Sequence, residues 1–146
     1  MTVTVETLSV IDDEIVEAFE RLPQLSQSAK RLDREALTQL VSGESTTVLI
    51  ALSDGKILGT LSLVMFRIPT GLRARIEGVV VDDAARGQGI GAALIEEAKA
   101  RANAAGARTL DLTSRASRTG ANRLYERLGF QARQSQIYRF APTADS

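Results

Sequence analysis

The glycine-rich stretch over residues 77–94 constrains the fold more strongly than any other part of the sequence. A β-branched run, Val79–Val81, ends in a short acidic turn, and three alternating glycines then precede an Ala- and Leu-rich segment. This order predicts a strand, a glycine loop and the first turn of a helix. Such a helix N-terminus leaves backbone N–H groups free at the positive end of the helix dipole, which suits a phosphate group. The stretch therefore predicts an α/β fold with an anionic ligand at this loop.

Hydrophobic spacing and turn residues place the other elements around this loop. Asp54-Gly55 predicts a hairpin and Pro69–Gly71 a second turn, so three antiparallel strands should precede the glycine loop. The expected order is β-α-α-β-β-β-α-β-α-β, which makes one α/β domain over residues 1–146 with a mixed central sheet. Strands are expected at 2–10, 46–52, 57–68, 73–81, 108–113 and 130–140, helices between Asp12 and Pro23, Asp33 and Gly43, Ile90 and Gly106, and Thr119 and Leu128, and a loop at 24–28.

The composition is that of an ordinary globular domain. Hydrophobic residues make up 44% of the 146 residues and charged residues 25%, which does not favour disorder. The longest apolar run is far shorter than the roughly 20 residues that a membrane span needs. The first six residues lack the basic start and the apolar core of a secretory signal. We therefore expect a soluble, cytoplasmic protein that has no membrane partner.

The chain contains no cysteine and no histidine. Without cysteine, disulfides, thiolate nucleophiles and cysteine-type zinc sites are excluded. Without histidine, the most common general base and the most common metal ligand are excluded as well. Proton transfer in an enzyme with this sequence must use carboxylates, tyrosines, lysines, the backbone or water. No metal site is expected.

The formal net charge is zero, but the charges are distributed unevenly. Residues 1–66 contain ten acidic and five basic residues, whereas residues 67–146 contain eight acidic and thirteen basic residues. The basic half is either a solvated surface or part of a site for an anionic ligand. Aromatic residues make up only 4% of the chain, too few for the stacking platforms that bind single-stranded nucleic acid. Nucleic acid is therefore not an expected partner.

Two motifs resemble the signatures of the Gcn5-related N-acetyltransferase (GNAT) family. Residues Arg86–Gly91 read Arg-Gly-Gln-Gly-Ile-Gly, which matches the Arg/Gln-x-x-Gly-x-Gly/Ala signature. Residues Tyr125–Phe130 read Tyr-Glu-Arg-Leu-Gly-Phe, which resembles the Tyr-Glu-Lys-Leu-Gly-Phe type. One helix, one strand and one helix separate the two motifs, as in the family. The resemblance implies a single N-acetyltransferase domain in which two parallel strands, 73–82 and 108–113, splay apart around acetyl-coenzyme A (acetyl-CoA).

The resemblance also implies which residues bind the coenzyme. The end of the strand would pair with the pantetheine arm, and the loop amides would hold the pyrophosphate. Glycine is required in the loop because a Cβ would obstruct the close approach of a phosphate. The coenzyme-binding residues implied in these two segments are Val79, Val80, Val81, Arg86, Gly87, Gln88, Gly89, Ile90 and Gly91.

The second motif supplies a candidate general acid. By the resemblance, Tyr125 would lie near the coenzyme sulfur and protonate the leaving thiolate; the alternative is a tyrosine that only packs on an amphipathic helix. Asn122 lies one turn earlier on the same face and would bond the pantetheine amides. Many family members have an asparagine seven residues before the tyrosine, where this chain has Arg118.

Glu77 is the candidate general base. With a period of two residues, its side chain shares a strand face with those of Val79 and Val81 and points toward the expected thioester. The alternative is a structural carboxylate that pairs with Arg75 or another strand arginine. Gly78, which follows it, indicates either a bulge or room for substrate.

The resemblance implies direct attack of an amine on the acetyl thioester in a ternary complex, with strand amides near Val79 stabilising the oxyanion. The expected acceptor is a primary amine, of a small molecule in preference to a protein. Its site is expected at the first two helices, the loop around Ser26 and the turn at Pro69–Gly71. Because the N-terminal half is acidic, we expect a cationic acceptor. The protein is expected to be a monomer or a homodimer.

Two other functions are compatible with parts of the sequence. One is a non-catalytic module that binds acyl-CoA as a metabolite sensor, although the presence of Glu77 and Tyr125 argues against it. The other is a nicotinamide-dinucleotide-binding protein, because Gly87, Gly89 and Ala92 fit the Gly-x-Gly-x-x-Gly/Ala fingerprint. That fingerprint requires the first glycine directly after an N-terminal strand, whereas about eighty residues precede it here.

Overall fold

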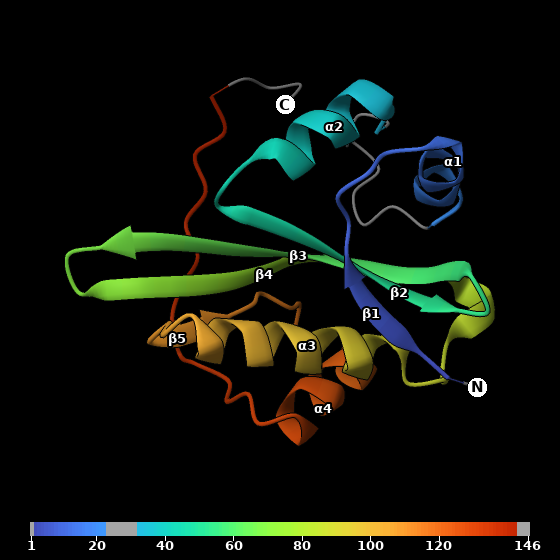
Figure 1. The fold of residues 1–146 in the computed structure, drawn as a ribbon. Helices are drawn as coiled ribbons and strands as arrows, with labels where there is room; N and C mark the ends of the chain where they lie inside the picture. The colour runs from blue at the N-terminus through green and yellow to red at the C-terminus, as the bar shows by residue number, and fades with distance from the viewer. Residues whose placement is uncertain (1, 23–31, 143–146) are drawn as a thin grey trace.

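A five-stranded mixed sheet, in the spatial order β1-β2-β3-β4-β5, runs through the centre of the molecule (Figure 1). The computed structural model describes residues 2–22 and 32–142. The first four strands are antiparallel neighbours, and β5 is parallel to β4. This arrangement confirms the expected α/β fold with a mixed sheet. The elements are β1 (Thr4–Thr7), α1 (Asp13–Arg21), α2 (Arg34–Ser42), β2 (Thr46–Ser53), β3 (Lys56–Ile68), β4 (Gly71–Val81), the 3₁₀ turn η1 (Asp83–Ala85), α3 (Ile90–Ala104), β5 (Thr109–Asp111) and α4 (Thr119–Arg127).

Local sequence signals set the start of the first two helices and the first hairpin. Oδ1 of Asp12 accepts a hydrogen bond from the backbone N–H of Ile15 at 2.9 Å, so Asp12 caps α1. Asp33 caps α2 in the same way. Asp54 and Gly55 both have positive φ angles, 52° and 77°, as the tight turn between β2 and β3 requires. Of the other expected features, Pro23, the loop at 24–28 and the acceptor loop around Ser26 lie outside the described residues.

The sheet separates two hydrophobic cores. On one face, Leu61, Leu63 and Ile76 pack with Leu94 and Ile95 of α3. Figure 1 shows α1 and α2 on one side of the sheet and α3 with α4 on the other. Burial of apolar side chains on both faces fixes the sheet between the two helical layers, at about 1.5–3 kcal/mol for each large side chain. The core under α1 and α2 includes Ile15, Phe19, Leu37, Val48 and Ile50.

The strand expected over residues 130–140 does not form, and that prediction was wrong. Residues 130–141 have no regular secondary structure, and Figure 1 shows this segment passing from the α4 side of the sheet to the α2 side without adding a strand. The side chains of Ile137 and Tyr138 are 66% and 90% exposed. The β-favouring residues here indicate a local propensity, but a strand needs a partner edge. The outer strand β5 offers an edge of three residues only.

No helix in the described part of the chain is long and apolar enough to cross a membrane.

Gly59 provides a test of the packing between β3 and α3. A Cβ on Gly59 would lie 2.9 Å from Cγ2 of Ile90 and 3.0 Å from the Val80 carbonyl oxygen. We expect Gly59→Ala to lower the free energy of unfolding by about 1–3 kcal/mol, measured by urea denaturation, because α3 or the strand must move. Gly43→Ala is the matched control, since its Cβ would meet only the Leu40 carbonyl oxygen at 3.6 Å. Equal stability of the two variants would contradict this account.

Candidate active site

The two parallel strands part after a short contact. β4 pairs with β5 only at Arg73–Arg75, opposite Thr109–Asp111. Beyond Arg75, β4 continues to Val81 and pairs only with β3 among the described strands. The segment 76–81 therefore has an edge without a strand partner, at the place where the pantetheine arm is expected. This is the splayed strand pair that the sequence predicts.

The glycine loop presents backbone amides without a side-chain cap. Gly87 and Gly89 both have φ angles of +80°, a conformation that L side chains rarely adopt. Gly89 is the N-cap residue of α3, where no side chain makes a capping hydrogen bond and the first turn contains no acidic residue. A Cβ at either glycine would meet no atom within 4 Å, so open space surrounds both. The free amides and the helix dipole fit a pyrophosphate group.

The side chains of the other expected coenzyme ligands lie in different surroundings. Val79 and Val81 pack against the α3 core, whereas Val80 packs against the α1–α2 core. Ile90 is buried, with 1% of its surface exposed. These four residues can therefore meet a ligand mainly through their backbone. Gln88 and Gly91 continue the loop into α3, and exposed Arg86 pairs with Asp83 at 3.0 Å.

Asp82 fixes the start of the loop. Its Oδ1 accepts a hydrogen bond from the Ala84 amide at 3.0 Å and so caps the turn η1. Its Oδ2 accepts a hydrogen bond from Nη1 of Arg21, while Nη2 of Arg21 donates to the Ile57 carbonyl oxygen at 2.9 Å. Arg21 thus joins the last turn of α1 to β3 and to the glycine loop. Sequence analysis missed this residue, because an arginine in the last turn of a helix carries no signal about a partner 61 residues away.

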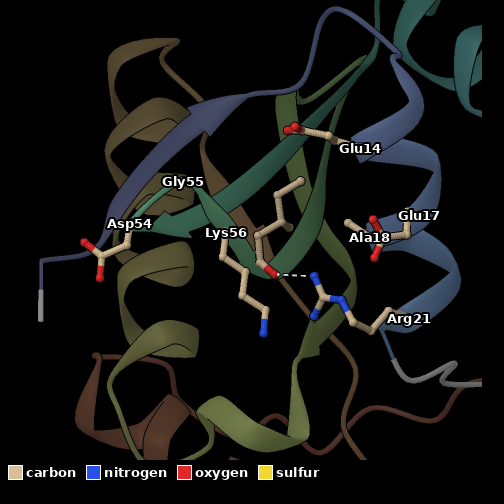
Figure 2. Close-up of a pocket in the computed structure, with 8 residues that line it drawn as sticks. Glu14, Glu17, Ala18, Arg21, Asp54, Gly55 and Lys56 are labelled. Carbon is tan, nitrogen blue, oxygen red and sulfur yellow. Dashed lines mark hydrogen bonds between the residues drawn. The ribbon is translucent and has the colours of Figure 1, made fainter.

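A pocket of about 290 Å³ lies beside Arg21 (Figure 2). It is formed between α1 and the β2–β3 turn, and Figure 2 shows the Arg21 guanidinium pointing to a backbone carbonyl at its wall. None of the expected site residues lines this pocket. Its lining residues are Glu14, Glu17, Ala18, Arg21, Asp54, Gly55, Lys56 and Ile57.

A bulge in β4 changes the direction of Glu77. Ser62 pairs with Glu77 and Thr60 pairs with Val80, so two residues of β4, Gly78 and Val79, lie opposite one residue of β3. Gly78 has a φ angle of +62°, which explains the glycine. Glu77 therefore lies on the sheet face opposite to that of Val79, and the expectation that the two share a face was wrong.

Glu77 is exposed and paired. Oε1 of Glu77 accepts a hydrogen bond from Nε of Arg75 at 3.2 Å, and 58% of the Glu77 side chain is exposed. The ion pair is the arrangement that the sequence left open as an alternative to a catalytic role. It does not exclude that role, because the carboxylate is accessible from solvent on the face opposite α3.

Tyr125 lies on the α3 face of the sheet. It is half-buried against the α3 core and packs edge-on against Phe130, with ring centroids 6.2 Å apart. Burial raises the pKa of the Tyr125 phenol above its ordinary value of 10.0, and the nearby positive charge of Arg118 acts in the opposite direction. The phenol therefore keeps its proton at neutral pH, as a general acid must.

Asn122 holds the loop before α4. Its Nδ2 donates to the carbonyl oxygens of Arg115 and Ala116, at 3.1 and 3.4 Å. Helix α4 itself packs near the start of α3, because a Cβ on Gly91 would lie 3.6 Å from Cδ2 of Leu124. The structure thus brings the second motif next to the glycine loop.

No group of three or more Asp or Glu side chains suited to a metal ion occurs in residues 2–22 and 32–142.

The sequence model of the acetyltransferase (GNAT) family matches residues 10–130. The chain belongs to the GNAT family. It is a GNAT-type N-acetyltransferase, and the parting strands, the glycine loop and Tyr125 are its expected site. No curated protein sequence matches the chain significantly.

Solved structures share this GNAT fold over nearly the whole chain. A protein described as a transcriptional regulator, from Bacillus halodurans C-125, is 27% identical with a TM-score of 0.79, over 96% of this chain and 100% of that one. A ribosomal-protein-alanine N-acetyltransferase from Brucella melitensis is 25% identical with a TM-score of 0.71, over 95% and 100%. An aminoglycoside acetyltransferase from an uncultured soil metagenomic sample is 20% identical with a TM-score of 0.79, over 97% and 96%.

The contact between Arg21 and Asp82 predicts a positioning role for Arg21. We expect Arg21→Gln to raise the KM for acetyl-CoA about tenfold, since loss of one charged hydrogen bond of roughly 1.5 kcal/mol frees the start of the glycine loop. The measurement is steady-state kinetics with acetyl-CoA varied. Arg34→Gln is the matched control, because Arg34 also bridges a carboxylate, Asp13, and a carbonyl oxygen, that of Ile11, away from the loop. An equal change in both variants would count against this role.

Proposed function

We propose that this protein transfers an acetyl group from acetyl-CoA to a primary amine by direct attack in a ternary complex. A small-molecule amine is the favoured acceptor, and a protein amine is the second choice. The observation that supports the proposal most directly is the position of two proton-transfer groups on opposite faces of β4. Glu77 lies on the face opposite α3, and Tyr125 lies on the α3 face.

Opposite faces suit a displacement at the acetyl carbon. The amine nitrogen adds to the thioester carbonyl carbon to form a tetrahedral oxyanion, and the carbonyl then reforms as the C–S bond breaks, so a base is needed near the amine and an acid near the sulfur. Glu77 accepts a proton from the ammonium group, directly or through water, so that the neutral amine can attack. Tyr125 gives its proton to the departing sulfur, and the second proton lost from the nitrogen passes to the solvent, from which Tyr125 is reprotonated. A protonated tyrosine on the leaving-group side and an accessible carboxylate on the nucleophile side meet these needs.

The binding residues follow the same geometry. The edge of β4 at Val79–Val81 holds the pantetheine arm through backbone groups, and an amide near Val79 stabilises the oxyanion. The amides of residues 87–91 hold the pyrophosphate, with Arg86 and Gln88 at its rim. Asn122 holds the loop before α4 in place through Nδ2, and its side-chain oxygen Oδ1 accepts a hydrogen bond from a pantetheine amide.

Release of free thiol from acetyl-CoA in the presence of an amine panel tests the proposed function. We expect amine-dependent release at neutral pH, together with stabilisation by acetyl-CoA but not by NAD in a thermal-shift assay. Tight coenzyme binding without release for any amine would contradict acetyl transfer and favour a non-catalytic sensor. That outcome has one observation in its favour, the similarity to a protein described as a transcriptional regulator.

Replacement of Glu77 tests the general base. We expect Glu77→Gln to lower kcat by about 10²–10⁴-fold and to flatten its dependence on pH, because the amide cannot accept the ammonium proton. The measurement is a kcat profile between pH 6 and about pH 9. Glu96→Gln, which removes an exposed carboxylate paired with Lys99 on α3, is the control and should leave the profile unchanged. A normal profile for Glu77→Gln would remove this residue from the mechanism.

Replacement of Tyr125 tests the general acid. We expect Tyr125→Phe to lower kcat by about 10²-fold or less, since water can supply the proton in its place. Because the raised pKa keeps the phenol protonated at neutral pH, the wild-type rate should fall only as the pH rises past that pKa. The variant should lack this alkaline fall. Tyr138→Phe, which changes the other tyrosine at a 90% exposed position, is the matched control.

A further inference from the structure

Two arginines share the sheet face of Glu77. In the register of the β3–β4 hairpin, Arg73 lies opposite Phe66, Arg75 opposite Val64 and Glu77 opposite Ser62. Alternation along β4 therefore puts the three charged side chains on one face, opposite α3. Figure 1 shows the tip of this hairpin extending beyond α2, and the side chains of Arg75 and Glu77 are 35% and 58% exposed.

Hydroxyl groups hold both guanidinium groups in place. Arg73 donates from Nη1 to Oγ1 of Thr109 at 3.3 Å and from Nη2 to Oγ1 of Thr70 at 2.8 Å. Arg75 donates from Nη2 to Oγ1 of Thr113 at 3.0 Å and from Nε to Glu77. A guanidinium group has five N–H donors, so these contacts use two from each arginine. Nε of Arg73 is buried and has no hydrogen-bond partner among the described residues.

The acceptor amine must reach this face if Glu77 takes its proton. Arg75 is two residues from Glu77 along the strand, about 6.8 Å, and Arg73 is twice as far. Val64 and partly exposed Phe66 lie beside the arginines on β3, where they offer apolar contact to a ligand that reaches from Glu77 to Arg73. The face therefore suits a molecule with an amine at one end, a short carbon skeleton and an anion at the other end.

We propose, on the basis of the proposed acetyl transfer, that the acceptor is a small primary amine that also carries a carboxylate or phosphate group. Arg73 and Arg75 bind the anionic group, because a fixed guanidinium matches the paired oxygens of either anion. Asp111, exposed on β5 opposite Arg75, and Glu77 are the carboxylates that β4 and β5 carry on this face. These two carboxylates repel the anionic group of the acceptor, so that it binds near Arg73 rather than near Glu77.

This acceptor differs from the cationic one expected from the acidic N-terminal half. None of the acidic side chains of that half belongs to β4 or β5, the strands that carry Glu77 and the two arginines. Glu14, Glu17 and Asp54 line the separate pocket beside α1 in Figure 2. The groups nearest the expected amine are instead two arginines.

Matched pairs of amines test the inference. The probes are 1-aminobutane, 4-aminobutanoate and 1,4-diaminobutane, which differ only in the charge at the far end, with glucosamine and glucosamine 6-phosphate as the phosphate arm. We expect kcat/KM to be about tenfold or more higher for at least one anionic probe than for its uncharged partner. The two arms distinguish a carboxylate from a phosphate. Equal or higher kcat/KM for the neutral or cationic probes would overturn the inference and leave the acetyl transfer intact.

Variants connect the preference to the two arginines. We expect Arg73→Gln and Arg75→Gln to raise the KM for the preferred anionic probe and to remove its advantage in kcat/KM over its uncharged partner, measured with acetyl-CoA at saturation. Arg75→Lys should retain part of the advantage of the anionic probe, because lysine keeps the positive charge. Arg67→Gln is the matched control, because Arg67 lies on the same hairpin with its side chain on the opposite face. Loss of the preference in Arg67→Gln, or its survival in both arginine variants, would overturn the assignment. Failure of every probe to be acetylated would overturn the proposed function as well.

Discussion

The extra residue at Gly78 is the constraint on which the geometry of the site depends. Without a bulge, regular alternation would put Glu77, Val79 and Val81 on one face, so the carboxylate and the valines could not lie on opposite faces. With it, the residues before and after the bulge exchange faces. Val79 and Val81 complete the core under α3, while Glu77 and the two arginines before it lie on the opposite face. One residue with a positive φ angle thus places the candidate base on the face opposite that of the candidate acid.

The separation of β4 from β5 follows from the short pairing between these two strands. β5 pairs with β4 over three residues, and side-chain bonds from Arg73 to Thr109 and from Arg75 to Thr113 add to this contact. The same arginines that face the expected acceptor therefore also tie the two strands together where they are still adjacent. Beyond Arg75, β4 has no backbone pairing with β5 among the described residues, which leaves the edge of β4 open. In the proposed function, the same two side chains link strand separation to acceptor selectivity.

Features that depend on neighbours in sequence could be predicted, and features that depend on distant pairing could not. The caps at Asp12 and Asp33, the turn at Asp54-Gly55 and the glycine loop each arise within a few residues. Gly78 indicated a bulge as one of two alternatives, but the face of Glu77 depends on the register between two strands, and the Arg21–Asp82 contact joins residues 61 positions apart. Neither leaves a periodic signal. The prediction of a strand at 130–140 failed for the same reason. The β propensity of this segment is local, and the edge of β5 is too short to pair with it.

The charges near the candidate site likewise could not be predicted from the charge balance along the sequence. The balance of charges over half a chain describes its average surface, but exposed charges more than about 8–10 Å apart are largely screened at physiological salt. The acceptor proposed at Glu77 would lie beside Arg75, on the strand that also carries Arg73. The N-terminal half is acidic as a whole, yet the strand that carries the candidate base brings two guanidinium groups to that base. The selectivity that we propose for the site rests on this local charge, which only the register of β4 reveals.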